Sequence, residues 1–363
     1  MRIVLYLICL MVSLKIEANP AEFEIIEKQN ISLLSSSTAP RSEPLQWFIP
    51  AKSYWLKKYH EEQVLYRHKV HLNELGLRIT ASDVKKARYK KHLFFVGCSI
   101  TLGQGVEDQQ TFSYLVSQAL EDYQVRNAGF RGAGIQDLHY FWKYLDLKQL
   151  SSQEEGILVV TLIPDHFSRL RLGWRYLDWA FPFATHYEVS ENELHFKGLV
   201  SETWSYKWSQ VIKKLGLSYW WLRLSHFHSG HLMRQGLAKM PILLRELKHE
   251  YLKQFPKGRF IVTWMRDDFI PMEKERSQFY GSLKQENIEF WPAEKNKDVD
   301  ELLKTKRWHI PHDGHPTPLA HRKYSDQLIR QINCQKQNSI HTHCTNRNMS
   351  QKLDLQHRST KSL

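Results

Sequence analysis

Two unbroken apolar runs, at residues 93–99 and 156–163, constrain the fold of this chain more than any other feature. Neither run alternates apolar with polar residues, so each predicts a strand covered on both faces, as in a parallel sheet between helices. Further strands and helical stretches alternate along the chain. We expect strands at 124–127, 259–265 and 288–291, and helices at 110–121, 135–147, 272–286 and 318–332. The sequence therefore predicts an α/β fold: a three-layer, doubly wound parallel sheet of about five strands.

The first apolar run ends in Gly97-Cys98-Ser99, and Asp313-Gly314-His315-Pro316 follows far downstream. A serine at the carboxyl end of a parallel strand lies where such folds bind ligands. An imidazole steered by a carboxylate can take its hydroxyl proton and make it a nucleophile. We expect Ser99 to be the nucleophile and His315 the base, with Asp313 orienting His315 from the same side of an extended segment. The alternatives are an ordinary turn serine, and Asp313 with His312 capping the final helix.

Three blocks in this order resemble the SGNH/GDSL hydrolases, a family of esterases, lipases and acyltransferases. Gly97-Cys98-Ser99-Ile100-Thr101-Leu102-Gly103 is similar to the Gly-Asp-Ser-x-Thr-x-Gly block, with Cys98 in place of Asp. Asn127-Ala128-Gly129-Phe130-Arg131-Gly132 resembles the second block, and Asp313-Gly314-His315-Pro316 the last. The resemblance covers about residues 62–333, including a lead-in at 73–78. It implies a flavodoxin-like SGNH hydrolase fold and a carboxylic ester hydrolase that needs no cofactor or metal.

The oxyanion hole is the point at which the chain departs from this family. The backbone N–H groups of Ser99 and Gly132 are the first candidates, and the Asn127 amide is a further one. Where the family carries an asparagine in its third block, this chain has Asp165, followed by His166. An ionised carboxylate would repel the oxyanion, so three outcomes stay open: Asp165 points away, His166 donates, or Asn127 contributes. Asp165 could also simply pair with an arginine, either Arg169 or Arg171. Cys98 is expected to be buried and without a nucleophilic role.

An aromatic-rich helical insertion is expected at about residues 167–250. It contains six of the twelve tryptophans: Trp174, Trp179, Trp204, Trp208, Trp220 and Trp221. These rings either form the insertion's own core or its contact with the sheet, or they line a pocket suited to sugar rings or acyl chains.

The two ends of the chain predict export and an unstructured tail. Residues 1–18 have the pattern of a cleaved signal peptide, because the apolar stretch is too short to span a bilayer. This predicts a secreted or periplasmic protein. Residues 19–61 are rich in Ser and Pro and predict a linker or N-terminal extension, and 334–363 predict a disordered basic tail. In that tail Cys334 and Cys344 either pair or stay free, and His341 and His343 do not form an enclosed metal site.

The chain is strongly basic, with a formal net charge of +13. Its lysines and arginines are scattered and no nucleic-acid-binding motif accompanies them, so we expect a solvated surface, with possible peripheral association with an anionic cell envelope, and no nucleic-acid partner. The sequence does not predict an oligomeric state. The function predicted is a serine esterase acting on an O-acetyl or other acyl ester of a small molecule, carbohydrate or lipid. The alternatives are an O-acyltransferase on a carbohydrate and a non-catalytic protein that binds glycan or lipid.

Overall fold

The computed structural model describes residues 23–26, 53–60, 62–85, 88–173, 176–177, 180, 184–265, 273–292 and 297–338. Its centre is a five-stranded sheet in the order β10-β9-β6-β4-β5. The strands are β4 (Lys91–Gly97), β5 (Tyr123–Gly129), β6 (Glu155–Leu162), β9 (Lys257–Trp264) and β10 (Glu289–Trp291). Every neighbouring pair is parallel. The predicted sheet is confirmed, with its two longest apolar runs, β4 and β6, side by side in the middle.

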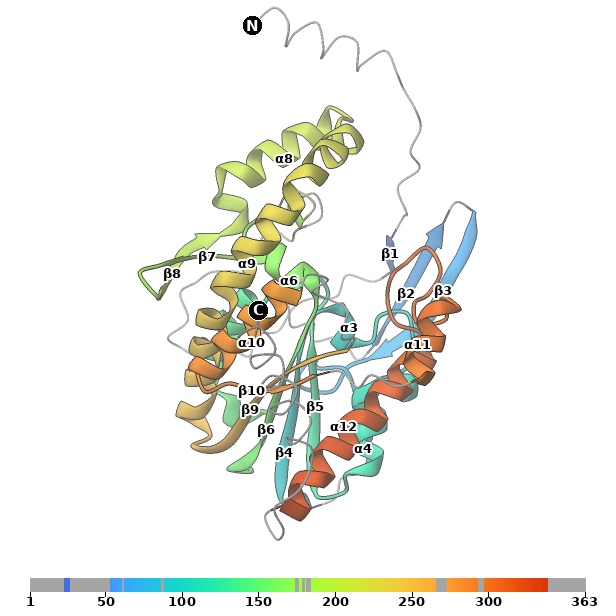
Figure 1. Ribbon diagram of the computed structural model, residues 1–363. Helices are drawn as coiled ribbons and strands as arrows, with labels where there is room; N and C mark the ends of the chain where they lie inside the picture. The colour runs from blue at the N-terminus through green and yellow to red at the C-terminus, as the bar shows by residue number, and fades with distance from the viewer. Residues whose placement is uncertain are drawn as a thin grey trace, which may run out of the picture.

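Helices cover both faces of the sheet (Figure 1). One face carries α5 (Ile135–Tyr144), α9 (Ser218–Gln254) and α10 (Glu273–Gln285), and the other carries α4 (Phe112–Ala119), α11 (Lys297–Lys304) and α12 (Pro318–Asn338). Along β4, Phe94 and Val96 pack into the first core. Leu93 and Phe95 pack into the second. Successive side chains of a strand point to opposite faces, so a strand between two cores must be apolar throughout.

A separate antiparallel sheet lies beside the carboxyl end of this core. It consists of β1 (Phe23–Ile26), β2 (Ser53–His60) and β3 (Gln63–His71), in that order. Tyr54 and Leu56 of β2 are buried in a cluster to which Ile310 also packs. Residues 53–60, which we assigned to a linker or extension, therefore form one strand of a packed hairpin, and the predicted boundary at 61/62 falls inside it.

The predicted helical insertion contains strands as well as helices. After α6 (Pro164–Leu170), β7 (Thr185–Ser190) and β8 (Glu193–Leu199) form an antiparallel hairpin. A short turn of helix, η4 (Val200–Glu202), leads to α8 (Trp204–Lys214) and then to α9. The second half of α9 packs on the sheet through Leu243, Leu247 and Tyr251. The boundary expected near residue 250 is therefore inside a helix of the main core.

The aromatic rings of this region differ in their surroundings. Tyr187 is buried, whereas Trp204 and Trp208 are exposed. Trp174 and Trp179 lie outside the described residues, and so do the side chains of Trp220 and Trp221. Trp204 and Trp208, the two tryptophans of the insertion whose side chains are described, thus do not form a core. Whether any ring lines a substrate pocket stays a prediction.

The remaining elements are short. They are α2 (Ala81–Lys85), α3 (Ser99–Leu102), η2 (Asp108–Gln110) and η3 (Leu147–Gln149). In the part of the chain that is described, no helix has the length and apolar character needed to cross a membrane. Helix α12 continues to Asn338, so the predicted tail begins later than residue 334. Cys334 is disulfide-bonded. Residues 1–18, 339–363 and the expected partner Cys344 lie outside the described residues, so signal peptide, tail and the pairing stay predictions.

Candidate active site

Ser99 lies at the turn from the central strand β4 into the short helix α3. Two glycines let this turn pack closely against β5. A Cβ on Gly97 would lie 2.2 Å from Oγ1 of Thr101, and one on Gly129 would lie 2.2 Å from the backbone N of Leu102. Real Cβ atoms do not approach so closely, so only glycine fits at either position. The serine is partly exposed at the carboxyl edge of the sheet.

Arg78 holds the chain that follows α3. Its guanidinium is buried and donates to the carbonyl oxygens of Leu102 at 2.8 Å, Gly103 at 2.6 Å and Val106 at 2.7 Å. It also pairs with Asp108 at 2.8 Å. Burial lowers the pKa of Arg78, and the adjacent Asp108 carboxylate opposes that effect. The lead-in that the sequence singled out at 73–78 therefore serves to fix the loop behind the serine.

Asp313 and His315 lie on a tight turn, so the prediction of an extended segment is wrong. The N–H of Ile310 donates to the His315 carbonyl at 2.7 Å, and the N–H of Asp313 donates back to Ile310 at 3.1 Å. His312 and Gly314 adopt left-handed conformations, with φ of 59° and 82°. The turn brings the His315 ring to Ser99 and the Asp313 carboxylate to the other side of that ring.

The alternative prediction, in which Asp313 and His312 cap the final helix, is wrong. Thr317 lies directly before α12, and its hydroxyl accepts the N–H of Ala320 at 3.3 Å. This is the bond that a capping residue makes at a helix start. Asp313 is thus available for a different role.

Ser99, His315 and Asp313 form one chain of hydrogen bonds. Nε2 of His315 is 2.8 Å from Oγ of Ser99, and Nδ1 is 2.7 Å from Oδ2 of Asp313. The Asp313 side chain has no exposed surface, and that of His315 is 17% exposed. The second Asp313 oxygen, Oδ1, accepts a hydrogen bond from the ammonium group of Lys58 on β2.

The negative charge on Asp313 determines which nitrogen of His315 carries the proton. Burial alone would raise the pKa of Asp313, but the hydrogen bond and charge of His315, followed by those of Lys58, outweigh it and lower the pKa below its ordinary value. An ionised Asp313 can only accept, so Nδ1 of His315 must carry a proton. In the neutral ring the lone pair is then on Nε2, facing the Ser99 hydroxyl. This is the state that a general base requires.

Lys58 is the site residue that sequence reasoning missed. It follows Tyr54 and Leu56 at the inward-facing, alternate positions of β2, and all three are buried. A lysine at a core position of a strand is unusual unless it is paired, so the alternation itself was the signal. At the end of the same strand His60 stacks on His312, with ring centroids 4.1 Å apart. The hairpin therefore contacts the turn at two points.

The predicted oxyanion donors have different surroundings. Within the described residues, neither the Ser99 N–H nor the N–H of Gly132 donates a hydrogen bond. The Asn127 side chain is already engaged, because its amide donates to Thr101 O at 2.9 Å and to Ser113 Oγ at 2.7 Å. Asn127 thus ties β5 to α3 and α4. The two backbone groups remain as candidates.

Asp165 and His166, at the start of α6, do not join this chain of hydrogen bonds. The Asp165 side chain is half exposed and lies 3.6 Å from Arg169, so the structural alternative from the sequence holds. His166 is fully buried, and its Nδ1 accepts the N–H of Ile163 at 3.2 Å. Burial lowers the pKa of His166 well below its ordinary value. Cys98 is buried, with a free thiol, as expected.

A hydrogen-bonded group of polar side chains, Gln104, Tyr66 and Arg131, lies near Asp313. Gln104 donates to the hydroxyl of Tyr66 at 2.8 Å and accepts from Arg131 at 3.2 Å. Burial lowers the pKa of Arg131, while Tyr54, Tyr66 and Asp313 oppose that effect. In the portion of the chain that is described, no group of three or more acidic, His or Cys side chains could hold a metal ion.

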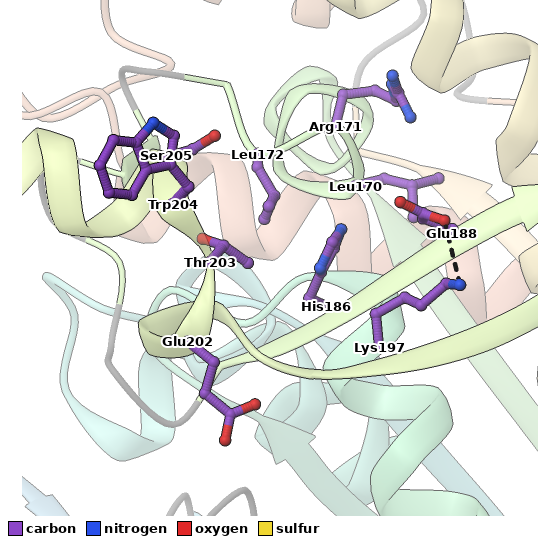
Figure 2. Close-up of a pocket in the computed structure, with 10 residues that line it drawn as sticks. All are labelled: Leu170, Arg171, Leu172, His186, Glu188, Lys197, Glu202, Thr203, Trp204 and Ser205. Atoms are coloured by element: carbon purple, nitrogen blue, oxygen red, sulfur yellow. Dashed lines mark ion pairs between the residues drawn. The ribbon is translucent and has the colours of Figure 1, made fainter.

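A cavity of about 510 Å³ lies elsewhere, in the insertion (Figure 2). It is enclosed by the end of α6, the β7–β8 hairpin and the start of α8. Glu188 and Lys197 form an ion pair of 3.4 Å across the hairpin. The lining residues are Leu170, Arg171, Leu172, His186, Glu188, Lys197, Glu202, Thr203, Trp204 and Ser205. None of the predicted site residues is among them, and its acidic and basic groups balance, so it does not indicate a ligand by charge.

No model of a known protein family matches the sequence, and no curated protein matches it. The chain has a weak similarity to several solved structures. One is a family 2 carbohydrate esterase with a carbohydrate-binding domain from Myceliophthora fergusii, at 12% identity and a TM-score of 0.36, and the match covers 68% of this chain and 67% of that one. A lipolytic protein of the G-D-S-L family from Veillonella parvula has 11% identity, coverages of 67% and 98%, and a TM-score of 0.36. A family 2 carbohydrate esterase from Clostridium thermocellum, solved with cellohexaose, has 10% identity, coverages of 70% and 66%, and a TM-score of 0.38. Similarity at this level does not assign an activity to the chain.

Proposed function

We propose that the protein is a serine esterase that hydrolyses carboxylic esters through Ser99, His315 and Asp313. The proposal is supported by one observation above all: the unbroken hydrogen-bond chain from the Asp313 carboxylate through His315 to the Ser99 hydroxyl. These groups come from a strand-to-helix turn and a distant loop. A turn serine with a purely structural role needs neither an imidazole at 2.8 Å nor a buried carboxylate behind it.

The reaction proposed has two halves. In the first, Oγ of Ser99 attacks the ester carbonyl while Nε2 of His315 takes its proton, and the buried Asp313 stabilises the resulting imidazolium. The backbone N–H groups of Ser99 and Gly132 hold the oxyanion. The C–O bond then breaks, and the departing alcohol receives the proton from His315. In the second half, water gives a proton to His315 and attacks the acyl-serine. The bond between the acyl carbon and Oγ then breaks, the carboxylic acid leaves, and His315 returns the proton to Ser99.

The substrate class proposed is an O-acetyl or other acyl ester of a carbohydrate or lipid outside the cytoplasm. It rests on the three sequence blocks and on the predicted signal peptide. The acyltransferase alternative uses the same acyl-serine and differs only in the group that attacks it. A sugar hydroxyl would replace water, so partition of the acyl group between water and added alcohols measures the difference directly.

Hydrolysis of p-nitrophenyl acetate tests the proposal. Ser99→Ala and His315→Ala should each lose activity by about a thousandfold or more, because members of a cooperating unit cost nearly as much singly as together. Asp313→Asn should keep more activity, since it perturbs the tautomer and orientation of His315 but leaves the base. Ser152→Ala, at an exposed serine, is the matched control.

A fluorophosphonate probe separates an enzyme from a binding protein. It should label the wild type and Ser152→Ala, and leave Ser99→Ala unlabelled. Wild-type turnover in Ser99→Ala would remove the serine from the mechanism. An unlabelled wild type with no turnover would favour the non-catalytic binding protein.

A further inference from the structure

Helix α8 carries a stripe of exposed apolar side chains that no packing within the protein requires. Trp204, Trp208, Val211 and Leu215 are 72%, 45%, 43% and 63% exposed. Their spacing of four, three and four residues places them on one face of a helix, the last of them one residue beyond its end. The two indole rings touch edge to face, with centroids 5.8 Å apart. The stripe therefore presents a continuous apolar surface to the outside.

The opposite face of α8 is the one that holds the helix in place. Ser209 is buried, and its hydroxyl donates to the Leu177 carbonyl at 3.3 Å. Tyr206 packs against the small cluster that contains Leu177 and Val200. A helix seated by one face normally turns charged or polar residues outward on the other. Here the outward face is apolar, so stability of the fold does not explain it.

The charged side chains of α8 itself have one sign. Residues 203–217 contain no acidic side chain, while Lys207 and Lys214, at helix positions beside the stripe, are exposed. The nearest acidic residue along the sequence, Glu202, accepts the N–H of Leu199 at 2.9 Å. The chain as a whole carries +13. In Figure 1, α8 and the start of α9 project beyond the sheet and its covering helices.

We propose that α8 docks the protein on an anionic lipid surface, with Trp204, Trp208, Val211 and Leu215 in the boundary between head groups and acyl chains. Tryptophan rings are favoured at that boundary, and an apolar stripe flanked by lysines is the pattern of a helix lying in the membrane plane. Lysines near an anionic surface add electrostatic attraction to the burial of the apolar stripe.

Two other occupants fit the stripe less well. A glycan ribbon stacks on flat rings, but Val211 and Leu215 offer none. A second copy of the chain would bring the same lysines together, because a two-fold contact places equal patches face to face. Like charges at such a contact cost free energy, whereas an anionic lipid surface neutralises them.

Co-sedimentation of the full chain with vesicles tests the proposal. Vesicles of phosphatidylcholine and phosphatidylglycerol should bind the protein, and vesicles of phosphatidylcholine alone should bind it much less. The double substitution Trp204→Gln with Trp208→Gln should weaken binding at least tenfold, and Lys207→Glu with Lys214→Glu should remove the preference for the anionic lipid. Trp55→Gln, at a partly exposed tryptophan of β2, is the matched control and should bind like the wild type. All variants keep the same N-terminus, so its apolar residues contribute equally.

The outcomes separate this proposal from its competitors and from the esterase. Ser99→Ala should bind vesicles like the wild type, so loss of chemistry and loss of docking are distinct results. Equal binding by the double tryptophan variant would overturn the proposal. So would a dimer in solution that this variant dissociates, retention on a neutral polysaccharide column through these rings, or failure of the wild type to bind vesicles. The stripe is exposed, so the variant should keep the wild-type melting temperature.

Discussion

Replacement of Lys58 by methionine tests how far the hairpin β2–β3 participates in the proposed chemistry. In the wild type the Asp313 carboxylate, which has no exposed side-chain surface, bonds Lys58 through Oδ1 and His315 through Oδ2. Methionine keeps most of the length of the side chain and removes its charge. Asp313 then keeps only one of these two partners, and its negative charge acts undiminished on the imidazole.

The size of the effect follows from the geometry. Groups bonded to opposite oxygens of one carboxylate are on the order of 6 Å apart, and two unit charges at that spacing interact by about 3 kcal/mol at an effective dielectric of about 20. Removing the ammonium therefore favours the imidazolium by up to roughly two pH units. The acid limb of the kcat/KM profile should move to higher pH by about one to two units. The plateau should fall about tenfold, because one orienting hydrogen bond is worth about 1.4 kcal/mol.

The assay is the pH dependence of p-nitrophenyl acetate hydrolysis by the wild type, Lys58→Met and Lys58→Arg. Arginine keeps the charge, so its acid limb should stay near that of the wild type. Lys57→Met is the control on the same strand; the Lys57 ammonium lies over the ring of Tyr59, 4.3 Å from its centroid. If Lys58→Met is folded and its acid limb coincides with that of the wild type, the electrostatic coupling between Lys58 and His315 is refuted.

Three further predictions concern packing, pH and export. Gly129→Ala should displace α3, since the added Cβ would lie 2.2 Å from the backbone N of Leu102. The free energy of unfolding should fall by about 1–3 kcal/mol, as measured with urea, and most of the esterase activity should be lost. Gly281→Ala is the control, because its added Cβ meets open space and should change neither quantity. Burial lowers the pKa of His92 from 6.5 to about 4, so the stability that its neutral form contributes is complete above pH 6.5 and is lost as pH falls through 4. Urea titrations at several pH values should show this fall, and His92→Asn should make it smaller without removing it, because other buried histidines, such as His68 and His139, also have lowered pKa values. Protein recovered from its native host should begin after residue 18, and an intact N-terminal methionine on a cytoplasmic species would contradict export.

The central sheet was predictable because strands buried on both faces leave a plain sequence signal. The runs that became β4 and β6 have no competing periodicity, and the residues that end them fall at the sheet's carboxyl edge. That placement, with the order of the sequence blocks, was enough to bring Ser99, Asp313 and His315 together as a hypothesis. Hydrogen bonds of 2.7 and 2.8 Å now join the three side chains.

The features that sequence reasoning missed depend on contacts between distant segments. Lys58 reaches Asp313 only when β2 packs against the turn at 310–315. No local sequence pattern predicts that packing. The turn itself needs left-handed backbone at His312, which is a rare conformation for a residue other than glycine. Asn127 was a candidate oxyanion donor from its motif, but its amide is used between β5 and α3. A motif identifies the residue, and packing decides which way the side chain points.

The contact between β2 and the turn at 310–315 joins segments near opposite ends of the folded chain. Ser99, the hairpin and all five parallel strands precede residue 292, so they leave the ribosome before Asp313 and His315 do. A growing chain therefore carries a serine without its base until nearly the whole folded length has been made. Hydrolytic activity, once it appears in a time course of synthesis or refolding, marks the moment when the turn at 310–315 reaches Ser99 and the hairpin.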